Sequence, residues 1–340
     1  MTHEAMLYKK LENGNVQCQL CGHRCFIKDG EKGKCLVRIN EGGQLNTLVF
    51  GKTISQHVDP IEKKPLYHFQ PGSYSYSIAT PGCNFTCQWC QNWEISQMPK
   101  FNTQYDGDYS SPEEIVKRAL AQKCKNIAYT YTEPTIFFEY AYQISQLAKE
   151  AQLANVFVTN GYMTEEMLAL YHPWLDAANV DIKAFSDKTY QKYIGAHLQP
   201  VLDSCKRMKA LGIWLEITTL VIPGINDDLA EMKALADFIV TELGAETPWH
   251  ISRYYPNYQF LKVSATPPKI LTDMESIGFQ AGLKYVYVGN LNMESNTRCP
   301  DCKTTVLKRW GNQTVFNNIT PEGCCPNCGA MIAGVGMYGS

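Results

Sequence analysis

Between residues 74 and 288, short runs of β-branched and aromatic residues alternate with longer amphipathic segments. This alternation predicts an α/β fold in which a parallel β-sheet is connected by crossover helices. The strand-like segments are Tyr74–Ala79, Asn126–Tyr131, Val156–Thr159, Val180–Lys183, Trp214–Val221, Trp249–Arg253 and Tyr285–Val288. Six or seven such units can form a full or partial barrel or remain open as a doubly wound sheet, and periodicity does not separate these architectures.

Two of the intervening helices have clear end signals. The first begins at Ser111, where Ser-Pro-Glu-Glu offers an N-cap, a proline at the first helical position and a glutamate for a capping box. The second follows Asp228 and runs to a glycine stop at Gly244. In either architecture, chemistry gathers at the carboxyl ends of the strands. The turn after the first strand, Thr80–Cys83, is a cysteine loop and not a glycine-rich dinucleotide fingerprint.

The composition is that of an ordinary globular protein. At 340 residues and 45% hydrophobic content, the chain can form one large domain with small appendages. Because 31 Lys and Arg are balanced by 33 Asp and Glu, no overall field attracts nucleic acid or an anionic membrane. Segment 1–14 lacks the apolar core of a signal peptide, and no run of about 18 apolar residues occurs. We therefore expect a cytoplasmic protein.

The chain contains 14 cysteines, which need an explanation. Cytosolic thiols stay reduced, so metal binding is a better explanation than disulfides. Twelve of the cysteines fall in three groups, at residues 18–35, 83–90 and 299–328. Cys124 and Cys205 stand alone in helix-like stretches, where a small buried side chain is the simpler interpretation.

The central group, Cys83, Cys87 and Cys90, has the spacing C-x3-C-x2-C and is called the central triad below. An iron-sulfur cubane normally takes four cysteine ligands, so a loop that offers three leaves one iron open to an outside ligand. A zinc ion would need a fourth local Cys or His. The nearest histidine, His68, lies upstream on the far side of a predicted strand. The motif therefore indicates a cluster with one open iron.

The motif resembles that of the radical SAM superfamily, in which an aromatic residue, here Trp89, precedes the third cysteine. The resemblance implies a partial (β/α)6 TIM-like barrel with small Cys-rich metal-binding segments at both ends. It also implies a [4Fe-4S] cluster whose open iron is chelated by S-adenosyl-L-methionine (SAM). One electron from a reductant such as flavodoxin or ferredoxin would then give methionine and a 5'-deoxyadenosyl radical, so the cofactor carries the difficult chemistry.

The resemblance places polar residues at the ends of the second and third strands in contact with SAM. Glu133 offers an anion for the SAM ammonium group, and Thr132 precedes it where the family usually has Gly-Gly-Glu. The backbone contact of this loop therefore departs from the family pattern. Alternatively, Glu133 caps the helix that begins near Pro134. Thr159 and Asn160 precede a glycine that permits a tight turn, and Asn160 is a candidate ligand for the ribose.

The fourth strand ends with Asp181 and Lys183, whose charges are costly in a buried run unless they pair or bind a ligand. The segment is similar to a strand of pyruvate formate-lyase activating enzyme, which implies that Lys183 lies near the SAM carboxylate and Asp181 near a monovalent cation. A mutual Asp-Lys pair is the alternative. That enzyme places an arginine on the fifth strand where this chain has Thr218, and Arg253 on the sixth strand could supply the missing charge.

The C-terminal tetrad consists of Cys299, Cys302, Cys325 and Cys328, arranged as two C-x2-C knuckles. Four local thiolates can complete a tetrahedron, so we expect a structural zinc whose binding contributes most of the folding free energy of this small segment. Cys324 is a spare thiol beside it.

The N-terminal tetrad consists of Cys18, Cys21, Cys25 and Cys35, and His23 lies within it. Zinc and a second iron-sulfur cluster both fit four cysteines, and the spacing does not match a ferredoxin run. We favour zinc, which would make this segment a structural clamp, whereas a cluster would make it an electron relay.

From end to end, the motifs resemble the AmmeMemoRadiSam system radical SAM enzymes, a family related to glycyl radical enzyme activases. That resemblance implies AMMECR1-type and Memo-type proteins as partners. The expected domains are an N-terminal Cys-rich metal-binding segment over residues 1–60, a radical SAM barrel over 61–290 and a zinc-ribbon-like domain over 291–340.

Three functions follow from these features. The leading one is an oxidoreductase-like enzyme that abstracts hydrogen from a small-molecule or peptide substrate, with His250 and Tyr255 as candidate substrate contacts. For His250, a hydrogen-bonded core position is equally plausible. A glycyl radical enzyme activase is the second. A non-catalytic metal-binding or nucleic-acid-binding scaffold is the third, and it is disfavoured because the C-terminal segment offers few stacking aromatics beyond Trp310 and Phe316.

Overall fold

An eight-stranded sheet forms the centre of the molecule, with the strand order β16-β15-β14-β13-β12-β11-β9-β8. The computed structural model describes residues 3–102 and 105–339. Strand β8 (Ser55–Pro60) pairs antiparallel to β9, and the other strands pair in parallel. The parallel strands are β9 (Tyr74–Ala79), β11 (Asn126–Tyr129), β12 (Ala154–Thr159), β13 (Ala177–Asp181), β14 (Trp214–Val221), β15 (Trp249–Arg253) and β16 (Val286–Gly289).

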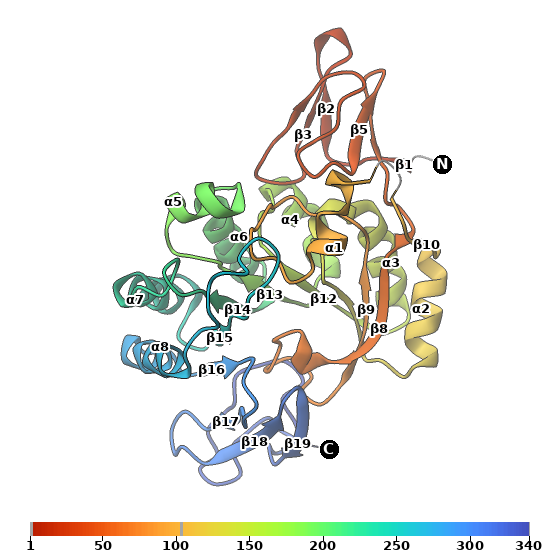
Figure 1. Cartoon of the computed structure of the whole chain (residues 1–340). Helices are drawn as coiled ribbons and strands as arrows, with labels where there is room; N and C mark the ends of the chain where they lie inside the picture. Colours follow the sequence, from red (N-terminus) through yellow and green to blue (C-terminus); the bar gives the residue numbers. More distant parts are fainter. Residues whose placement is uncertain (1–2, 103–104, 340) are drawn as a thin grey trace.

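The strand order decides between the two architectures that periodicity left open. From β9 to β16, neighbours in space are neighbours in sequence, whereas a doubly wound sheet reverses its order partway across. The longer helices lie around the outside of the curved sheet (Figure 1). The outermost strands of the sheet are β8 and β16, so it is a partial barrel rather than a closed one. The predicted α/β class with a mostly parallel central sheet is confirmed.

The helices begin and end where local sequence signals place them. The capping box at Ser111 is present, with Glu114 N donating to Ser111 Oγ at 3.3 Å. Asp228 caps the second predicted helix, which continues as a π-helical turn over Ile239–Leu243 and stops at Gly244. The helices are α1 (Trp93–Ser96), α2 (Pro112–Ala121), α3 (Phe138–Glu150), α4 (Glu165–Tyr171), α5 (Asp187–Thr189), α6 (Gln199–Ala210), α7 (Leu229–Phe238) and α8 (Pro268–Ala281).

The core lies between the sheet and the surrounding helices. The central strands are covered on both faces, so they read as nearly continuous apolar runs, and all four residues of β11 are buried. The lone thiols of Cys124 and Cys205 are both buried in this core, as expected. None of the helices in the described ranges is long and apolar enough to cross a membrane.

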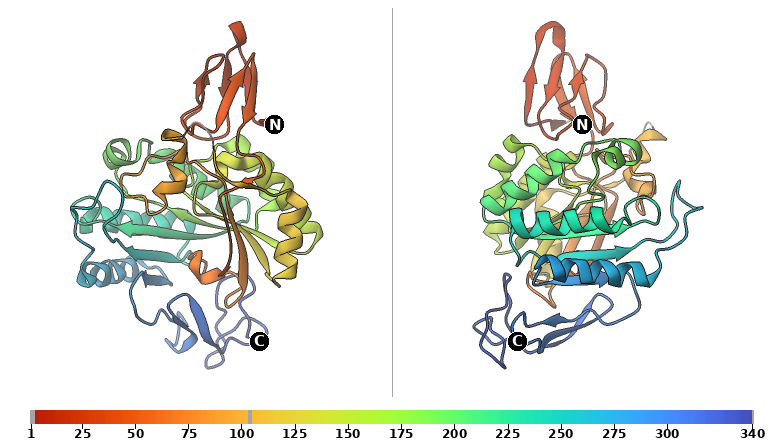
Figure 2. Two further views of the ribbon diagram at one scale, coloured as in Figure 1. Left: turned by 45° about the vertical axis from the view of Figure 1, so that its right-hand side comes forward. Right: turned by 90° about the vertical axis from the view of Figure 1, so that its left-hand side faces the viewer.

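The segment before the barrel forms two small three-stranded antiparallel sheets, which stand at one end of the molecule (Figure 2). Strand β8 lies within the predicted N-terminal segment 1–60 but pairs with the barrel sheet along its whole length. A chain boundary set by cysteine grouping cannot detect this edge strand. The strands are β1 (His3–Glu4), β2 (Tyr8–Lys10), β3 (Val16–Cys18), β4 (Phe26–Ile27), β5 (Arg38–Glu41) and β6 (Gln44–Thr47); a further strand, β7 (Lys52–Thr53), pairs with β10 (Asp108–Tyr109).

The C-terminal segment forms a three-stranded ribbon of β17 (Thr297–Arg298), β18 (Thr305–Trp310) and β19 (Gln313–Asn317) at the opposite end of the barrel (Figure 2). Arg309 of β18 is fully buried against the barrel. Its Nη2 atom donates to Tyr67 O at 2.7 Å, and its guanidinium lies 4.2 Å from the centre of the Tyr67 ring. The ribbon is therefore docked through a buried cation.

Candidate active site

A pocket of about 510 Å³ lies on the inner face of the sheet and collects most of the predicted site residues. Its size is typical of sites that bind a drug-sized ligand. The predicted residues that line it are Cys83, Cys87, Trp89, Cys90, Thr132, Glu133, Thr159, Asn160, Asp181, Lys183 and His250. They come from the ends of several strands because the carboxyl ends of parallel strands meet at one edge of the sheet.

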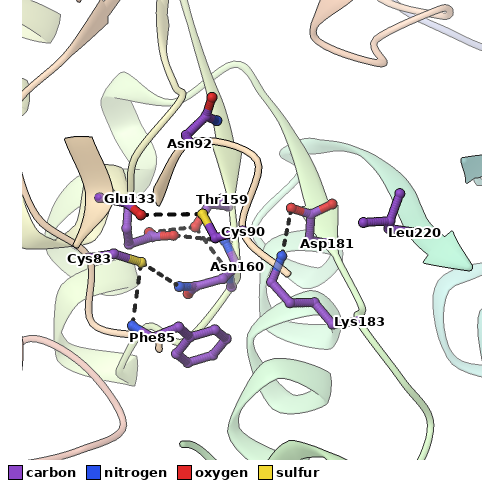
Figure 3. A network of polar contacts seen from close by, with 12 residues as sticks. Cys83, Phe85, Cys90, Asn92, Glu133, Thr159, Asn160, Asp181, Lys183 and Leu220 are labelled. Carbon is purple, nitrogen blue, oxygen red and sulfur yellow. Dashed lines mark hydrogen bonds and ion pairs between the residues drawn. The ribbon is translucent and has the colours of Figure 1, made fainter. Parts of the chain in front are cut away.

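The central triad lies in the loop between β9 and α1, which is fixed by hydrogen bonds of its backbone. Figure 3 shows Cys83 and Cys90 of this loop and the bond from Phe85 to Cys83. Phe85 N donates to Cys83 Sγ at 3.4 Å, and Phe85 O accepts from Gln97 Nε2 at 3.1 Å. Thr86 N donates to Ile194 O at 2.9 Å. These contacts hold the loop open around the pocket without using the thiols of Cys87 and Cys90.

The spacing of the sulfur atoms tests whether a cluster fits the central triad. In the described ranges, the C-terminal tetrad is the only group of three or more metal-ligating side chains whose ligand atoms all lie within 4.8 Å of one another. At least one pair of sulfurs in the central triad is therefore more than 4.8 Å apart, which is wider than the spacing of thiolates around one zinc ion. A cubane requires this spread, because each thiolate binds a different iron.

His68, the nearest histidine upstream of the central triad, is unavailable as a fourth ligand. It is buried with both ring nitrogens engaged, since Nδ1 donates to Ala333 O at 2.6 Å and Nε2 accepts from the Tyr287 hydroxyl at 2.6 Å. Burial lowers the pKa of His68 to about 4. A zinc site built from the central triad and His68 therefore does not form.

Trp89 packs the triad loop against the rest of the barrel. Its side chain is buried, and its ring centre lies 5.6 Å from that of Phe260 and 6.2 Å from that of Tyr193. The aromatic residue of the motif therefore contributes to fixing the loop, apart from any contact that it makes with SAM.

Glu133 joins the ends of β11 and β12 (Figure 3). Its Oε1 atom accepts from Thr135 N at 3.0 Å, Thr135 Oγ1 at 2.6 Å and Thr159 Oγ1 at 2.7 Å, and its Oε2 atom accepts from Asn160 N at 2.8 Å. Glu133 is thus the N-cap of the 3-10 helix Pro134–Phe137, which was the alternative to SAM binding. Burial raises its pKa, although these four donors oppose that shift.

Asn160 and Thr132 fix the neighbouring strand ends. Asn160 Nδ2 donates to Asn84 Oδ1 at 2.7 Å, and Thr132 Oγ1 donates to Thr80 O at 2.8 Å. The turn after Asn160 requires glycine, because Gly161 has φ of 68° and a Cβ there would lie 2.7 Å from a Val180 methyl group. The polar groups at the ends of β9, β11 and β12 are therefore linked to one another at the pocket wall.

Asp181 and Lys183 form an ion pair at the pocket wall, with Lys183 Nζ 3.0 Å from Asp181 Oδ2 (Figure 3). The mutual pair, the alternative to ligand binding, is therefore present. Burial disfavours the lysine charge, but the Asp181 carboxylate outweighs it and raises the pKa of Lys183. Thr218 lies opposite Asp181 in the sheet, lines the pocket, and has a buried hydroxyl without a hydrogen-bond partner in the described part of the chain.

Of the three contacts predicted on β15 and just after it, only His250 reaches the pocket. His250 lines the wall and is buried, with Nε2 2.6 Å from Glu216 Oε2, so this ring nitrogen has the partner expected of a core histidine. Arg253 and Tyr255 are absent from the described lining residues. Arg253 Nε donates to Thr266 O at 2.8 Å, and Nη1 donates to the Tyr255 hydroxyl at 3.1 Å. Side chains alternate along a strand, so Arg253 faces away from the side that carries His250.

Besides the predicted Lys183, two further cations reach the pocket that the sequence did not indicate. Lys63 and Lys64, at the end of the 3-10 helix Ile61–Lys63, both line it. Lys64 is buried, donates to Asp59 Oδ2 at 2.7 Å and lies 4.5 Å from the centre of the Tyr131 ring. Burial lowers the pKa of Lys64 to about 8. The available signal was a pair of adjacent lysines between the acidic Asp59 and Glu62 and a proline, close before a predicted strand.

The C-terminal tetrad has the geometry of a single metal site. Cys299 Sγ lies 3.5 Å from Cys328 Sγ, and Cys302 Sγ lies 3.6 Å from Cys325 Sγ. Four thiolates around one zinc ion, with Zn-S bonds of about 2.3 Å, are about 3.8 Å apart. Cys324 is outside the group, as expected. The Cys-rich cluster at this end therefore fits a mononuclear ion.

The N-terminal tetrad is arranged differently. All four of its cysteines line a second, small cavity whose wall is almost entirely apolar, together with His23 and Arg38. This cavity is separate from the pocket at the central triad, with no lining residue shared between them.

Comparisons with known proteins show which family this chain resembles. Residues 77–239 match the family model described as the radical SAM superfamily. An uncharacterized protein of Methanocaldococcus jannaschii is 42% identical over 332 residues, which cover 97% of this chain and 98% of that protein. A putative glycyl-radical enzyme activating enzyme of the same organism is 26% identical over 186 residues, 52% of this chain and 66% of that protein.

Two further matches are more distant. The isethionate sulfite-lyase activating enzyme of Nitratidesulfovibrio vulgaris is 27% identical over 135 residues, 38% of this chain and 43% of that enzyme. The structure of Streptococcus suis SuiB bound to S-adenosylmethionine has a TM-score of 0.50 and 11% identity, covering 68% of this chain and 53% of that one, which supports the fold alone. With its cysteine loop at the end of the first parallel strand and its match to the family model, the chain belongs to the radical SAM superfamily and is an enzyme.

Proposed function

We propose that the central triad holds a [4Fe-4S] cluster and that the 510 Å³ pocket beside it binds SAM and a small-molecule or peptide substrate. The single observation that supports this most strongly is the convergence of three thiols and the polar ends of several strands on one pocket. When bound, the cluster and SAM would supply a 5'-deoxyadenosyl radical that abstracts hydrogen from the substrate.

The side chains around the pocket would bind and orient SAM. Glu133 would offer its carboxylate at the wall to the SAM ammonium group, while its four hydrogen bonds hold the ends of β11 and β12 in place. Asn160 and Thr159 are beside it for the ribose. Lys183 would contact the SAM carboxylate and share its charge with Asp181, which in turn is the candidate ligand for a monovalent cation.

The far wall of the pocket would select the substrate. It carries Lys64, Tyr67 and His250 from the barrel and Asn312 from the turn between β18 and β19 of the ribbon. This wall offers cationic and hydrogen-bonding groups, and the ribbon turn contributes to it. SAM would fill a large part of the pocket, so the remaining space suits a small molecule or a short peptide segment.

The test is anaerobic reconstitution of the cluster followed by addition of dithionite and SAM. We expect 5'-deoxyadenosine in the wild type and none above background in the variant with alanine at all three positions of the central triad. Cys124→Ala is the matched control, because Cys124 is a buried cysteine outside every group. Absence of the nucleoside from wild-type protein with a confirmed cluster would contradict the proposal.

A glycyl radical enzyme activase is the second candidate, and the similarity to two proteins named as activating enzymes favours it. In that case the substrate is a backbone glycine of a partner protein. A glycyl radical signal in a candidate partner, dependent on this chain and SAM, would distinguish it from the first candidate.

We further propose a structural zinc ion at the C-terminal tetrad, supported by the sulfur separations of 3.5 and 3.6 Å. A metal is also proposed for the N-terminal tetrad. Flavodoxin or ferredoxin would serve as reductant, and AMMECR1-type and Memo-type proteins are the proposed partners. Co-purification from cells that express both partner types, measured against the Cys324→Ala control and an unrelated bait, would test that association.

A further inference from the structure

We propose that the N-terminal tetrad (Cys18, Cys21, Cys25 and Cys35) holds an iron-sulfur cluster, and not zinc, and that this cluster passes single electrons to the cluster at the central triad. The inference rests on the proposed function of the central triad. It replaces the zinc clamp that the cysteine spacing favoured.

The two tetrads of this chain differ in the spacing of their sulfur atoms. The C-terminal sulfurs all lie within 4.8 Å of one another, as one tetrahedral ion requires, and no other group of three or more does so in the described ranges. Any three of the N-terminal sulfurs therefore include at least one pair more than 4.8 Å apart, yet all four cysteines line one cavity. Thiolates that each bind a different iron of a cluster need this wider arrangement.

A buried cation with unused hydrogen-bond donors lies at the same cavity. Arg38 lines the cavity and is 2% exposed. It pairs with the buried carboxylate of Glu139, but its Nε and Nη1 atoms have no hydrogen-bond partner among the described residues. An unsatisfied buried donor is costly, and the bridging sulfides of an iron-sulfur cluster would add acceptors and negative charge to those of the four thiolates that either metal centre would bring.

The N-terminal tetrad is in direct contact with the loop of the central triad. His23, between Cys21 and Cys25, has its Nε2 atom 2.8 Å from the carbonyl oxygen of Asn84, the residue after Cys83. The His23 ring also lies against Phe85, with ring centres 6.5 Å apart. One hydrogen bond thus connects the two cysteine loops.

The tetrad segment also packs closely against the barrel beside the triad loop. Gly22 N donates to Tyr162 O at 3.0 Å, and a Cβ at Gly22 would lie 2.8 Å from the Tyr162 ring. A Cβ at Gly82, just before the central triad, would lie 2.8 Å from a Val37 methyl group. Electron transfer between the two groups would suit this packing, because the tetrad segment and the triad loop touch directly at Val37 and Gly82 and at His23 and Asn84. In the transfer itself, an external one-electron reductant reduces the N-terminal cluster by one electron, which then moves to the triad cluster with no bond formed or broken.

The decisive experiment counts iron, acid-labile sulfide and zinc in the anaerobically purified full chain. We expect about eight irons, eight sulfides and one zinc per chain in the wild type, and about four irons and one zinc in the triple alanine variant of the central triad. That variant leaves the N-terminal tetrad intact, so its retained iron does not depend on the folding of a tetrad mutant. Cys124→Ala should match the wild type.

The outcomes separate the two proposals. About four irons and two zincs in the wild type, with all iron lost from the triad variant, would overturn the N-terminal cluster and leave the triad cluster standing. Iron content that is unchanged by the triad substitutions would instead contradict the proposed function. Electron paramagnetic resonance of the reduced triad variant should show a cluster signal that does not change when SAM is added, and a silent spectrum would count against the proposal.

The relay is tested with Cys25→Ala and Cys35→Ala combined, in protein that retains about four irons. With a flavodoxin as reductant, freeze-quenched electron paramagnetic resonance spectra should show the signal of the triad cluster appearing at least tenfold more slowly than in the wild type. SAM should still alter this signal. Reduction at the wild-type rate would overturn the relay.

Discussion

Replacing Glu133 with glutamine removes one charge from the pocket and should destabilise the protein by about 1–3 kcal/mol. The carboxylate accepts four hydrogen bonds, of which two come from the backbone N–H groups of Thr135 and Asn160. The other two come from the hydroxyls of Thr135 and Thr159, which can turn. A glutamine amide has one oxygen and one NH2 group, so it can accept on only one side.

Both orientations of the amide leave one backbone N–H unsatisfied. If the amide oxygen takes the place of Oε1, the NH2 group faces Asn160 N–H; if the amide is flipped, it faces Thr135 N–H. Glu133 is 1% exposed, so water cannot compensate for the lost acceptor. One buried donor without an acceptor costs about 1–3 kcal/mol. For a chain longer than 250 residues, this corresponds to a fall in Tm of about 2–6 °C.

The assay is thermal unfolding under anaerobic conditions, followed by circular dichroism, together with the SAM dissociation constant from equilibrium dialysis. Glu165→Gln is the matched control, because Glu165 is on α4 with a side chain that is 69% exposed. We expect Glu133→Gln to lower Tm and to weaken SAM binding about tenfold, and Glu165→Gln to change neither. A Tm for Glu133→Gln equal to that of the control would refute the hydrogen-bond reasoning, and unchanged SAM affinity would refute the role of the charge.

Three further predictions concern the ribbon. Arg309→Met leaves the buried Glu62 carboxylate without its cation and should cost about 3–5 kcal/mol in urea unfolding, whereas Lys308→Met, on the exposed face of the same strand, should be neutral. Burial lowers the pKa of His68 to about 4, so the neutral ring stabilises the folded protein. This contribution to the free energy of unfolding is complete above pH 6.5 and is lost as the pH falls toward 4. This loss is up to about 3 kcal/mol. Between pH 6.5 and pH 4 the unfolding free energy should fall more steeply in the wild type than in His68→Gln, and equal slopes would contradict the prediction. Removing zinc with a chelator should unfold the ribbon, visible as faster amide exchange in β18 with the barrel unchanged, and equal protection with and without chelator would count against a structural zinc.

Features encoded within one short segment could be predicted from the sequence. The seven parallel strands lie within a few residues of their predicted positions, and the capping box at Ser111 is present, because hydrophobic period and capping chemistry are local. The central triad was equally accessible, since its three cysteines lie in one loop. The strand ends then converge on the pocket because parallel strands share one carboxyl edge.

Pairings between distant segments could not be predicted from the sequence. His250 was an ambiguous candidate because its partner Glu216 lies on the neighbouring strand. Arg253 was assigned to the pocket from its position near the strand end, although the alternation of side chains along β15 directs it away. Lys64, a cation of the pocket that was not predicted, depends on the fold of a 3-10 helix that no periodicity marks.

The N-terminal tetrad shows why a count of ligands does not determine the metal. Four thiols are equally compatible with zinc and with a cubane, and the difference lies in the distances between sulfurs. Those distances are set by where the loops of two small sheets dock on the barrel, through contacts such as that of Arg38 with Glu139, 101 residues away. The same docking brings His23 to the carbonyl of Asn84. The placement of the four thiols and their connection to the triad loop therefore depend on the same docking of distant segments, which no local pattern in the sequence specifies.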